Sequence, residues 1–293
     1  MSIRTIGWIG LGAMGAPMAL VAAKTGFEVT AFDLGPDAMG RVAPSVAGAS
    51  SAREAAQGKD MVAIMVATGP QLESVLFGDG GIAKVLGQDT VVMVMATVGP
   101  SAIEQVRDQL APITTHLVDA PVSGGVVRAG KGDLLMMVSG APADVERARP
   151  VLDALASSAP SVGDIPGDGQ RFKVVNQLLC GVHIAVAGEA LALADSMGLD
   201  VKQVHEVLGA GAAASFMFGD RGQRMVDGDH DEVRSALDIF VKDMGIVSQA
   251  AREVAQEVPL AVTAEQLYLR GRRQGLGRKD DSVVVQLLRG NQD

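Results

Sequence analysis

The chain has 293 residues, of which 48% are hydrophobic and 20% are charged, a globular composition with room for two domains. Its net charge of −9 and the absence of a basic run exclude nucleic-acid binding, which requires a positive surface. The single cysteine, Cys180, excludes an intrachain disulfide and a multi-thiolate metal site, and the four histidines lack the spacing of zinc ligands, so we expect no metal.

Neither a targeting segment nor a membrane span is expected. The first residues, MSIRTIGWIGLG, are too short and too rich in glycine for a signal peptide. No stretch approaches about 18 apolar residues without glycine or charge. Residues 174–193 come closest but contain four polar residues, Asn176, Gln177, His183 and Glu189. We therefore expect a soluble, cytoplasmic protein with no membrane partner.

The first 165 residues alternate between apolar runs and Ala-rich amphipathic stretches such as 15–26 and 100–112. Continuous apolar runs are typical of strands buried on both faces of a parallel sheet. They predict strands at 5–9, 28–32, 61–66, 91–95, 116–118 and 134–138. The repeated alternation of strand and helix predicts an α/β fold with an N-terminal Rossmann-type doubly wound parallel sheet.

The strand signal ends after a Gly- and Pro-rich segment at 160–169. Helical patterns follow at 170–196, 200–211, 235–254 and 263–275. We therefore predict a dinucleotide-binding domain over residues 1–164 and an all-α C-terminal domain over 165–293. The long apolar helix is unsuited to facing water alone, so the second domain is expected to form the subunit interface of a homodimer or homotetramer.

Three glycines, Gly10, Gly12 and Gly15, follow the first predicted strand in the spacing GxGxxG and open the first helix. Such a loop makes a tight turn, admits a pyrophosphate close to the backbone and presents a helix N-terminus to the phosphates. Glycine-rich turns are common, but the position of this one between a predicted strand and a predicted helix supports its interpretation as a dinucleotide-binding loop. The expected cofactor contacts in this loop are Gly10, Leu11, Gly12, Ala13, Met14 and Gly15.

Asp33 closes the second predicted strand, 18 positions after Gly15. A carboxylate there accepts hydrogen bonds from the adenosine ribose hydroxyls and repels a 2′-phosphate. No arginine follows until Arg41, so the sequence favours NAD over NADP. The alternative interpretation is that Asp33 caps the end of the strand.

Two further segments contain candidate chemistry. Ser123, Gly124 and Gly125 form a turn that can direct a hydroxyl and backbone N–H groups at one anion, such as a substrate carboxylate, although an ordinary loop has the same composition. Lys173 lies near the start of an apolar helix, where a desolvated amine serves as general base or acid. The alternative for Lys173 is a lysine that extends its amine to solvent from a helix end.

The segments GLGAMGAPMA, DAPVSGGVVRAGKGDLLMMVSG and GDGQRFKVVN together resemble the β-hydroxyacid dehydrogenase family, which includes 3-hydroxyisobutyrate and tartronate semialdehyde enzymes. The resemblance spans essentially the whole chain. It implies NAD-dependent oxidation of a small hydroxy acid, with Lys173 as acid and base and Ser123, Gly124, Gly125, Asn176 and Gln177 around the substrate. It also implies that Thr97 and Lys242 contact the cofactor.

One departure concerns substrate choice, because the family commonly has two asparagines where this chain has Asn176 and Gln177. Gln177 and the C-terminal segments NQLLCGVHIAVAGEALALADSMGLD and SALDIFVKDMGIV resemble the L-threonate dehydrogenase branch, whose substrates are four-carbon sugar acids. Alternatives are a reductase of small semialdehydes and a non-catalytic dinucleotide-binding module. Arg221 and Arg224 lie either in a segment that closes over the substrate or in a surface turn.

Overall fold

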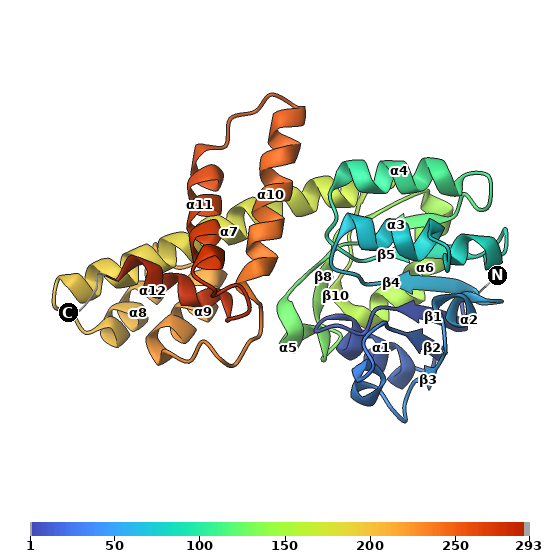
Figure 1. The fold of residues 1–293 in the computed structure, drawn as a ribbon, viewed down its shortest axis with the longest axis horizontal. Helices are drawn as coiled ribbons and strands as arrows, with labels where there is room; N and C mark the ends of the chain where they lie inside the picture. The colour runs from blue at the N-terminus through green and yellow to red at the C-terminus, as the bar shows by residue number, and fades with distance from the viewer. Residues whose placement is uncertain (1, 290–293) are drawn as a thin grey trace. The chain divides into compact units, whose positions relative to one another are not determined.

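The computed structural model describes residues 2–289, and their first part contains an eight-stranded sheet of order β11-β9-β6-β5-β4-β1-β2-β3 (Figure 1). Strands β3-β2-β1-β4-β5-β6 have the order of a Rossmann fold and pair in parallel, whereas β9 is antiparallel to β6. The strands are β1 (Thr5–Ile9), β2 (Glu28–Phe32), β3 (Ala47–Gly48), β4 (Met61–Ile64), β5 (Val91–Val94), β6 (Leu117–Asp119), β9 (Val138–Ser139) and β11 (Ser161–Gly163).

A second, three-stranded sheet has the order β10-β8-β7. Its strands are β7 (Val122–Ser123), β8 (Leu134–Met136) and β10 (Ala156–Ser158). The single strand predicted at 134–138 is therefore wrong. At Met137, whose N–H donates to the carbonyl of Pro121, the chain leaves β8 in one sheet and enters β9 in the other. Both strands are largely buried, so the apolar run does not reveal the break.

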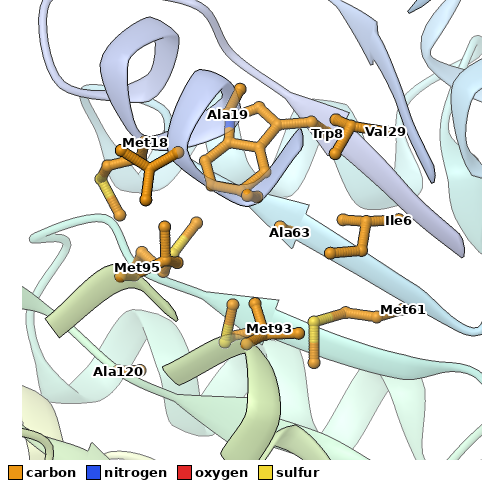
Figure 2. Packing of buried hydrophobic residues seen from close by; sticks show 14 of the residues in the cluster. Ile6, Trp8, Met18, Ala19, Val29, Met61, Ala63, Met93, Met95 and Ala120 are labelled. Carbon is orange, nitrogen blue, oxygen red and sulfur yellow. The ribbon is translucent and has the colours of Figure 1, made fainter. Parts of the chain in front are cut away.

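Helices cover both faces of the large sheet, and alternate strand residues point to opposite faces. Ile6 and Trp8 belong to the core that includes residues of α1 and α6, whereas Ile9 belongs to the core that includes residues of α2, α3 and α4. Figure 2 shows Trp8 of β1 against Ala19 of α1, above the methionines of neighbouring strands. These helices are α1 (Gly15–Lys24), α2 (Ala52–Ala56), α3 (Gly69–Phe77), α4 (Pro100–Leu110) and α6 (Pro142–Leu155), and the short α5 (Gly125–Ala129) follows β7.

Three short 3₁₀ helices complete the assignment, η1 (Ala38–Arg41), η2 (Ile82–Val85) and η3 (Asp281–Val283). The fold class predicted from the sequence, a parallel α/β sheet followed by helices, is confirmed.

The C-terminal part is helical and has its own core. Its helices are α7 (Asp168–Ser196), α8 (Val201–Gly209), α9 (Phe216–Asp227), α10 (Leu237–Glu253), α11 (Pro259–Arg273) and α12 (Val284–Leu288). Ile184 and Leu191 of α7 pack with Phe240 and Met244 of α10 and with the aromatic ring of Tyr268. The Tyr268 hydroxyl donates a hydrogen bond of 2.7 Å to the carbonyl of Gly181, which fixes α11 against α7.

The chain divides into two compact units between Lys173 and Val174, within α7. The boundary expected at residues 164–165 lies in the loop before this helix. Helix α7 has 29 residues and is long and apolar enough to cross a membrane, contrary to the expectation that no segment qualifies. Within the protein, 44% of its apolar window is buried, and a single helix of this kind is weak evidence for a membrane span.

Candidate functional site

The glycine-rich loop between β1 and α1 is shaped by close backbone contacts. Gly10 has φ 98°, and a Cβ there would lie 2.2 Å from the carbonyl oxygen of Met65 on the neighbouring strand segment. A Cβ on Gly15 would lie 2.1 Å from the carbonyl oxygen of Gly10. Gly12, by contrast, is exposed with nothing within 4 Å of a Cβ position. Gly12 therefore leaves open space before the N-terminus of α1, which fits a bound pyrophosphate.

Asp33 lies just after β2 and holds the loop from the other side. Its Oδ2 accepts a 2.6 Å hydrogen bond from the N–H of Leu11, and its Oδ1 accepts one of 2.7 Å from Gly35. Arg41 is separated from Asp33 in the sequence, but its Nη1 donates a 3.0 Å hydrogen bond to the carbonyl of Leu11. A carboxylate and a guanidinium thus both contact Leu11, and Asp33 remains partly exposed for a ribose hydroxyl.

A buried carboxylate, Asp119 at the end of β6, organises the start of α7. Its Oδ2 accepts from the N–H groups of Gly167 and Gln170 at 3.1 and 3.0 Å and from the hydroxyl of Ser139 at 3.3 Å. Its Oδ1 accepts from Gln170 Nε2 at 2.7 Å. Asp119 is fully buried, and burial raises the pKa of its carboxyl from an ordinary 3.8 to about 6, although these hydrogen bonds act in the opposite direction.

Gln170 extends this network to the loop after β5. Its Oε1 accepts from the N–H groups of Val98 and Gly99, both at 3.0 Å, and its Nε2 donates to the carbonyl of Ala96 at 3.0 Å. Thr97 lies within this loop. Gln170 was not predicted from the sequence, because it occupies a variable position of the signature GDGQRFK.

The network positions Lys173, which follows Gln170 by one helical turn. Gly169 allows the close approach, because a Cβ there would lie 2.4 Å from the carbonyl oxygen of Met137 and 2.9 Å from Asp119 Oδ2. Lys173 is 6% exposed. The alternative that Lys173 extends its amine into solvent is therefore not favoured.

The turn after β7 contains two glycines in the left-handed region of the backbone. Gly124 and Gly125 have φ values of 141° and 74°, which are unfavourable for other residues. Ser123 is partly exposed at the end of β7, and Gly125 opens α5. Ser123 ends β7 and Thr97 lies in the loop after β5, and both belong to the first unit.

In the second unit, Gln177 and Asn176 of α7 form a chain of hydrogen bonds with α10. Gln177 Nε2 donates to Oδ2 of Asp243. Asn176 Nδ2 donates to Gln177 Oε1 at 2.8 Å and to Cys180 Sγ at 3.4 Å. Lys242 Nζ forms an ion pair of 2.9 Å with Asp243 Oδ1. Two predicted substrate residues and one predicted cofactor residue therefore meet at Asp243.

The two arginines of α9 form ion pairs, and Arg221 is buried. Arg221 contacts Asp281 at 3.2 Å, and Arg224 contacts Asp280 at 3.0 Å. Burial opposes the charge of Arg221, but the carboxylates of Asp281 and Asp220 outweigh it and raise the pKa of Arg221. Both arginines thus fix α9 to η3, so neither a closing segment nor a surface turn describes them.

Three of the four histidines have structural partners. His116 contacts Asp144 at 2.6 Å, His205 contacts the carbonyl of Phe218 at 3.0 Å, and His230 contacts Ser282 at 2.9 Å. Within residues 2–289, no group of three or more His, Cys, Asp or Glu side chains is arranged to hold a metal ion.

Two protein-family models match the chain, one over most of each unit. Residues 5–163 match the model of the NAD-binding domain of 6-phosphogluconate dehydrogenase, and residues 167–288 match that of the NAD-binding segment of NADP-dependent 3-hydroxyisobutyrate dehydrogenase.

Three individual proteins are similar over almost their full length. The chain is 39% identical to an L-threonate dehydrogenase of Cupriavidus necator, covering 98% of this chain and 97% of that protein. It is 32% identical to a 2-hydroxy-3-oxopropionate reductase of Escherichia coli, covering 97% and 96%. The crystal structure of a 3-hydroxyisobutyrate dehydrogenase from Salmonella typhimurium has a TM-score of 0.90 at 38% identity, covering 97% and 99%.

The raised pKa of Asp119 predicts a pH dependence of stability. An acid whose pKa is higher in the folded state stabilises that state when protonated, and the contribution is lost as pH rises from 3.8 through about 6. The free energy of unfolding of the wild type, relative to Asp119→Asn, should therefore fall over this range and level off above about pH 7. Urea denaturation of both proteins between pH 4 and 8 measures this difference, and parallel curves would contradict the assignment.

Proposed function

Because the chain belongs to the β-hydroxyacid dehydrogenase family of NAD-dependent oxidoreductases, we propose that it oxidises L-threonate, or a closely related four-carbon hydroxy acid, to the oxo acid. The similarity to L-threonate dehydrogenase over 98% of the chain carries this proposal. The glutamine at position 177, in place of the family's second asparagine, supports it from the sequence.

Lys173 is the general base and acid of the proposed reaction. When bound, NAD accepts the hydride that leaves the hydroxyl-bearing carbon of the substrate. Lys173 Nζ takes the proton of that hydroxyl in the oxidative direction and returns it in the reductive direction. Burial of an amine favours its neutral, proton-accepting form, and Lys173 is buried.

In the proposed reaction, the remaining predicted residues bind and orient the substrate and the cofactor. The hydroxyl of Ser123 and the N–H groups of Gly124 and Gly125 donate hydrogen bonds to the substrate carboxylate. Asn176 and Gln177 orient the hydroxylated part of the substrate. Thr97 and Lys242 contact the nicotinamide half of the cofactor, the loop Gly10–Gly15 receives the pyrophosphate, and Asp33 accepts from the adenosine ribose.

A second candidate is the reduction of a small semialdehyde, with Lys173 as proton donor. The 32% identity with a 2-hydroxy-3-oxopropionate reductase favours it. Both reactions use the same side chains, so the residues do not distinguish them. The substrate panel below does.

The substrate panel is the first test. We expect NADH formation with L-threonate to exceed that with D-threonate, D-erythronate, L-serine, D-glycerate and 3-hydroxyisobutyrate. Lys173→Met should lower kcat by about 10³-fold while NAD affinity is retained, because only proton transfer is lost. The matched control, Lys202→Met on α8, changes an exposed lysine and should retain full activity. Faster turnover of another acid, or of tartronate semialdehyde with NADH, would contradict the L-threonate assignment.

Asp33 is expected to determine the preference for NAD. Asp33→Ser removes the repulsion of a 2′-phosphate and leaves Arg41 nearby as a cation. The ratio of kcat/KM with NAD to that with NADP should fall at least about tenfold, equivalent to one lost hydrogen bond to a charged group. Asp37→Ser, at an exposed aspartate of the same loop, is the control. An unchanged ratio would leave Asp33 as a cap of the strand end only.

We further propose that the protein is a cytoplasmic homodimer or homotetramer without nucleic-acid or membrane partners. The support is a stripe of exposed apolar residues along α7, formed by Val175, Leu179, Val186 and Leu193. At 100° per residue these side chains lie within about 40° of one another on the helix. Such a stripe is suited to burial against a second copy.

Substitution within the stripe tests this assembly. Val186→Asp places a charge in the proposed interface and should reduce the mass measured by light scattering to that of a monomer. Val207→Asp, at an exposed valine of α8, should leave the mass unchanged. A wild-type monomer would contradict the proposal.

A further inference from the structure

Gln170, in the first turn of α7, is a fully buried side chain that uses all of its hydrogen-bonding positions. Its Oε1 accepts from the N–H groups of Val98 and Gly99. Its Nε2 donates to the carbonyl of Ala96 and to Oδ1 of Asp119. A carboxamide has two acceptor and two donor positions, so these four hydrogen bonds satisfy it completely. Gln170 therefore acts on its protein neighbours and not on a ligand.

The backbone alone determines which way this carboxamide points. A backbone N–H can only donate, and a backbone carbonyl can only accept. The atom of Gln170 that faces Val98 and Gly99 must therefore be oxygen, and the atom that faces Ala96 must be nitrogen. All three contacts have a length of 3.0 Å, the usual distance of an N–H···O hydrogen bond. A reversed carboxamide would leave these buried groups without partners, which is costly.

The contacts lie on both sides of Thr97. The carbonyl of Ala96 belongs to the peptide group before Thr97, and the N–H of Val98 belongs to the peptide group after it. Peptide groups are planar, so holding both of them restricts the φ and ψ rotations of Thr97. The segment 96–99 follows the carboxyl end of β5, the edge of the sheet at which Rossmann folds bind dinucleotides. One side chain thus fixes the backbone of this segment.

The same residue belongs to the helix turn that contains Lys173. The backbone N–H of Gln170 donates to Oδ2 of Asp119 at 3.0 Å, so one carboxyl group holds both its main chain and its side chain. Lys173 follows three positions later, and residues at this spacing have Cβ atoms about 5–6 Å apart on one face of a helix. A shift of Gln170 relative to segment 96–99 therefore shifts Lys173 as well.

We propose that Gln170 is a positioning residue for the dehydrogenase reaction: its carboxamide sets the position of segment 96–99, which receives the nicotinamide half of NAD, relative to the helix turn of Lys173. This inference rests on the proposed function and deepens it, because it names the side chain that aligns hydride transfer with proton transfer. Such alignment matters, since a displacement of about 1 Å can lower a rate about 10²-fold.

Two substitutions of similar size test this role. Gln170→Met removes all four hydrogen bonds of the side chain, whereas Gln170→Glu retains an acceptor for the two N–H groups but loses the donating NH₂. Both should lower kcat about 10²-fold, whereas a space-filling role predicts nearly full activity. The matched control, Arg171→Met, removes an exposed side chain that pairs with Asp168 and Glu104, and it should retain full activity.

Binding measurements separate a local effect from misfolding. ADP contains the adenosine and pyrophosphate parts of the cofactor but lacks the nicotinamide half. Its Kd, measured by calorimetry, should stay within about twofold of wild type in both Gln170 variants, whereas the Kd of NADH should rise about tenfold, as for one lost hydrogen bond. Equal weakening of ADP and NADH, or unchanged NADH affinity together with unchanged kcat, would overturn the proposal.

A double variant tests whether Gln170 acts through Lys173. In Lys173→Met no amine remains to be aligned, so the addition of Gln170→Met should lower the residual kcat about tenfold or less, instead of about 10²-fold. Losses that multiply independently would overturn the link between the two residues.

Hydrogen exchange provides a test that does not depend on turnover. The N–H groups of Val98 and Gly99 should exchange slowly in the wild type and in Arg171→Met without cofactor, and rapidly in Gln170→Met. Rapid exchange in the wild type would overturn the proposal. Slow exchange and selective loss of NADH affinity, in a protein that oxidises no acid of the panel, would support the positioning of segment 96–99 and contradict the proposed function.

Discussion

The buried carboxylate of Asp119 is the interaction on which the arrangement of the first unit depends. It receives hydrogen bonds from the first turn of α7, and Gln170 extends them to the backbone after β5. A strand end, a loop and a helix start thus share one group of polar atoms that is inaccessible to water. Leaving any one of these donors without its acceptor costs about 1–3 kcal/mol, so the three segments hold one another in place.

A second buried carboxylate, Asp243, has a comparable position in the second unit. Asp119 receives backbone and side-chain donors and fixes where a helix begins, whereas Asp243 receives a side-chain carboxamide and fixes which way it points. In both cases hydrogen bonds to a buried carboxyl group restrict a conformational choice. Burying a carboxyl group is costly, and here Asp119 is surrounded by donors while Asp243 contacts Gln177 and Lys242.

The sequence predicted the elements whose pattern is local. Apolar runs located β1 and β2 at their observed bounds, and glycine spacing located the loop between β1 and α1. Strands of two or three residues, such as β3 and β7, are too short to show a period. The role of Gln170 and the contact between Gln177 and Asp243 were missed for a different reason. The partners lie 72 and 66 positions apart, and no spacing in the sequence records a contact at such separations.

Helix α7 has a consequence for any rearrangement of the protein. Over 29 residues it is a rod of roughly 43 Å that starts in one unit and runs through the other. Lys173 and Asn176 are separated by three residues on this rod, so their Cβ atoms stay about 5–6 Å apart whatever the two units do. For the proposed reaction this means that the amine of Lys173 and the carboxamide of Asn176 would keep one fixed spacing along the helix, and a substrate that contacts both would have to match it.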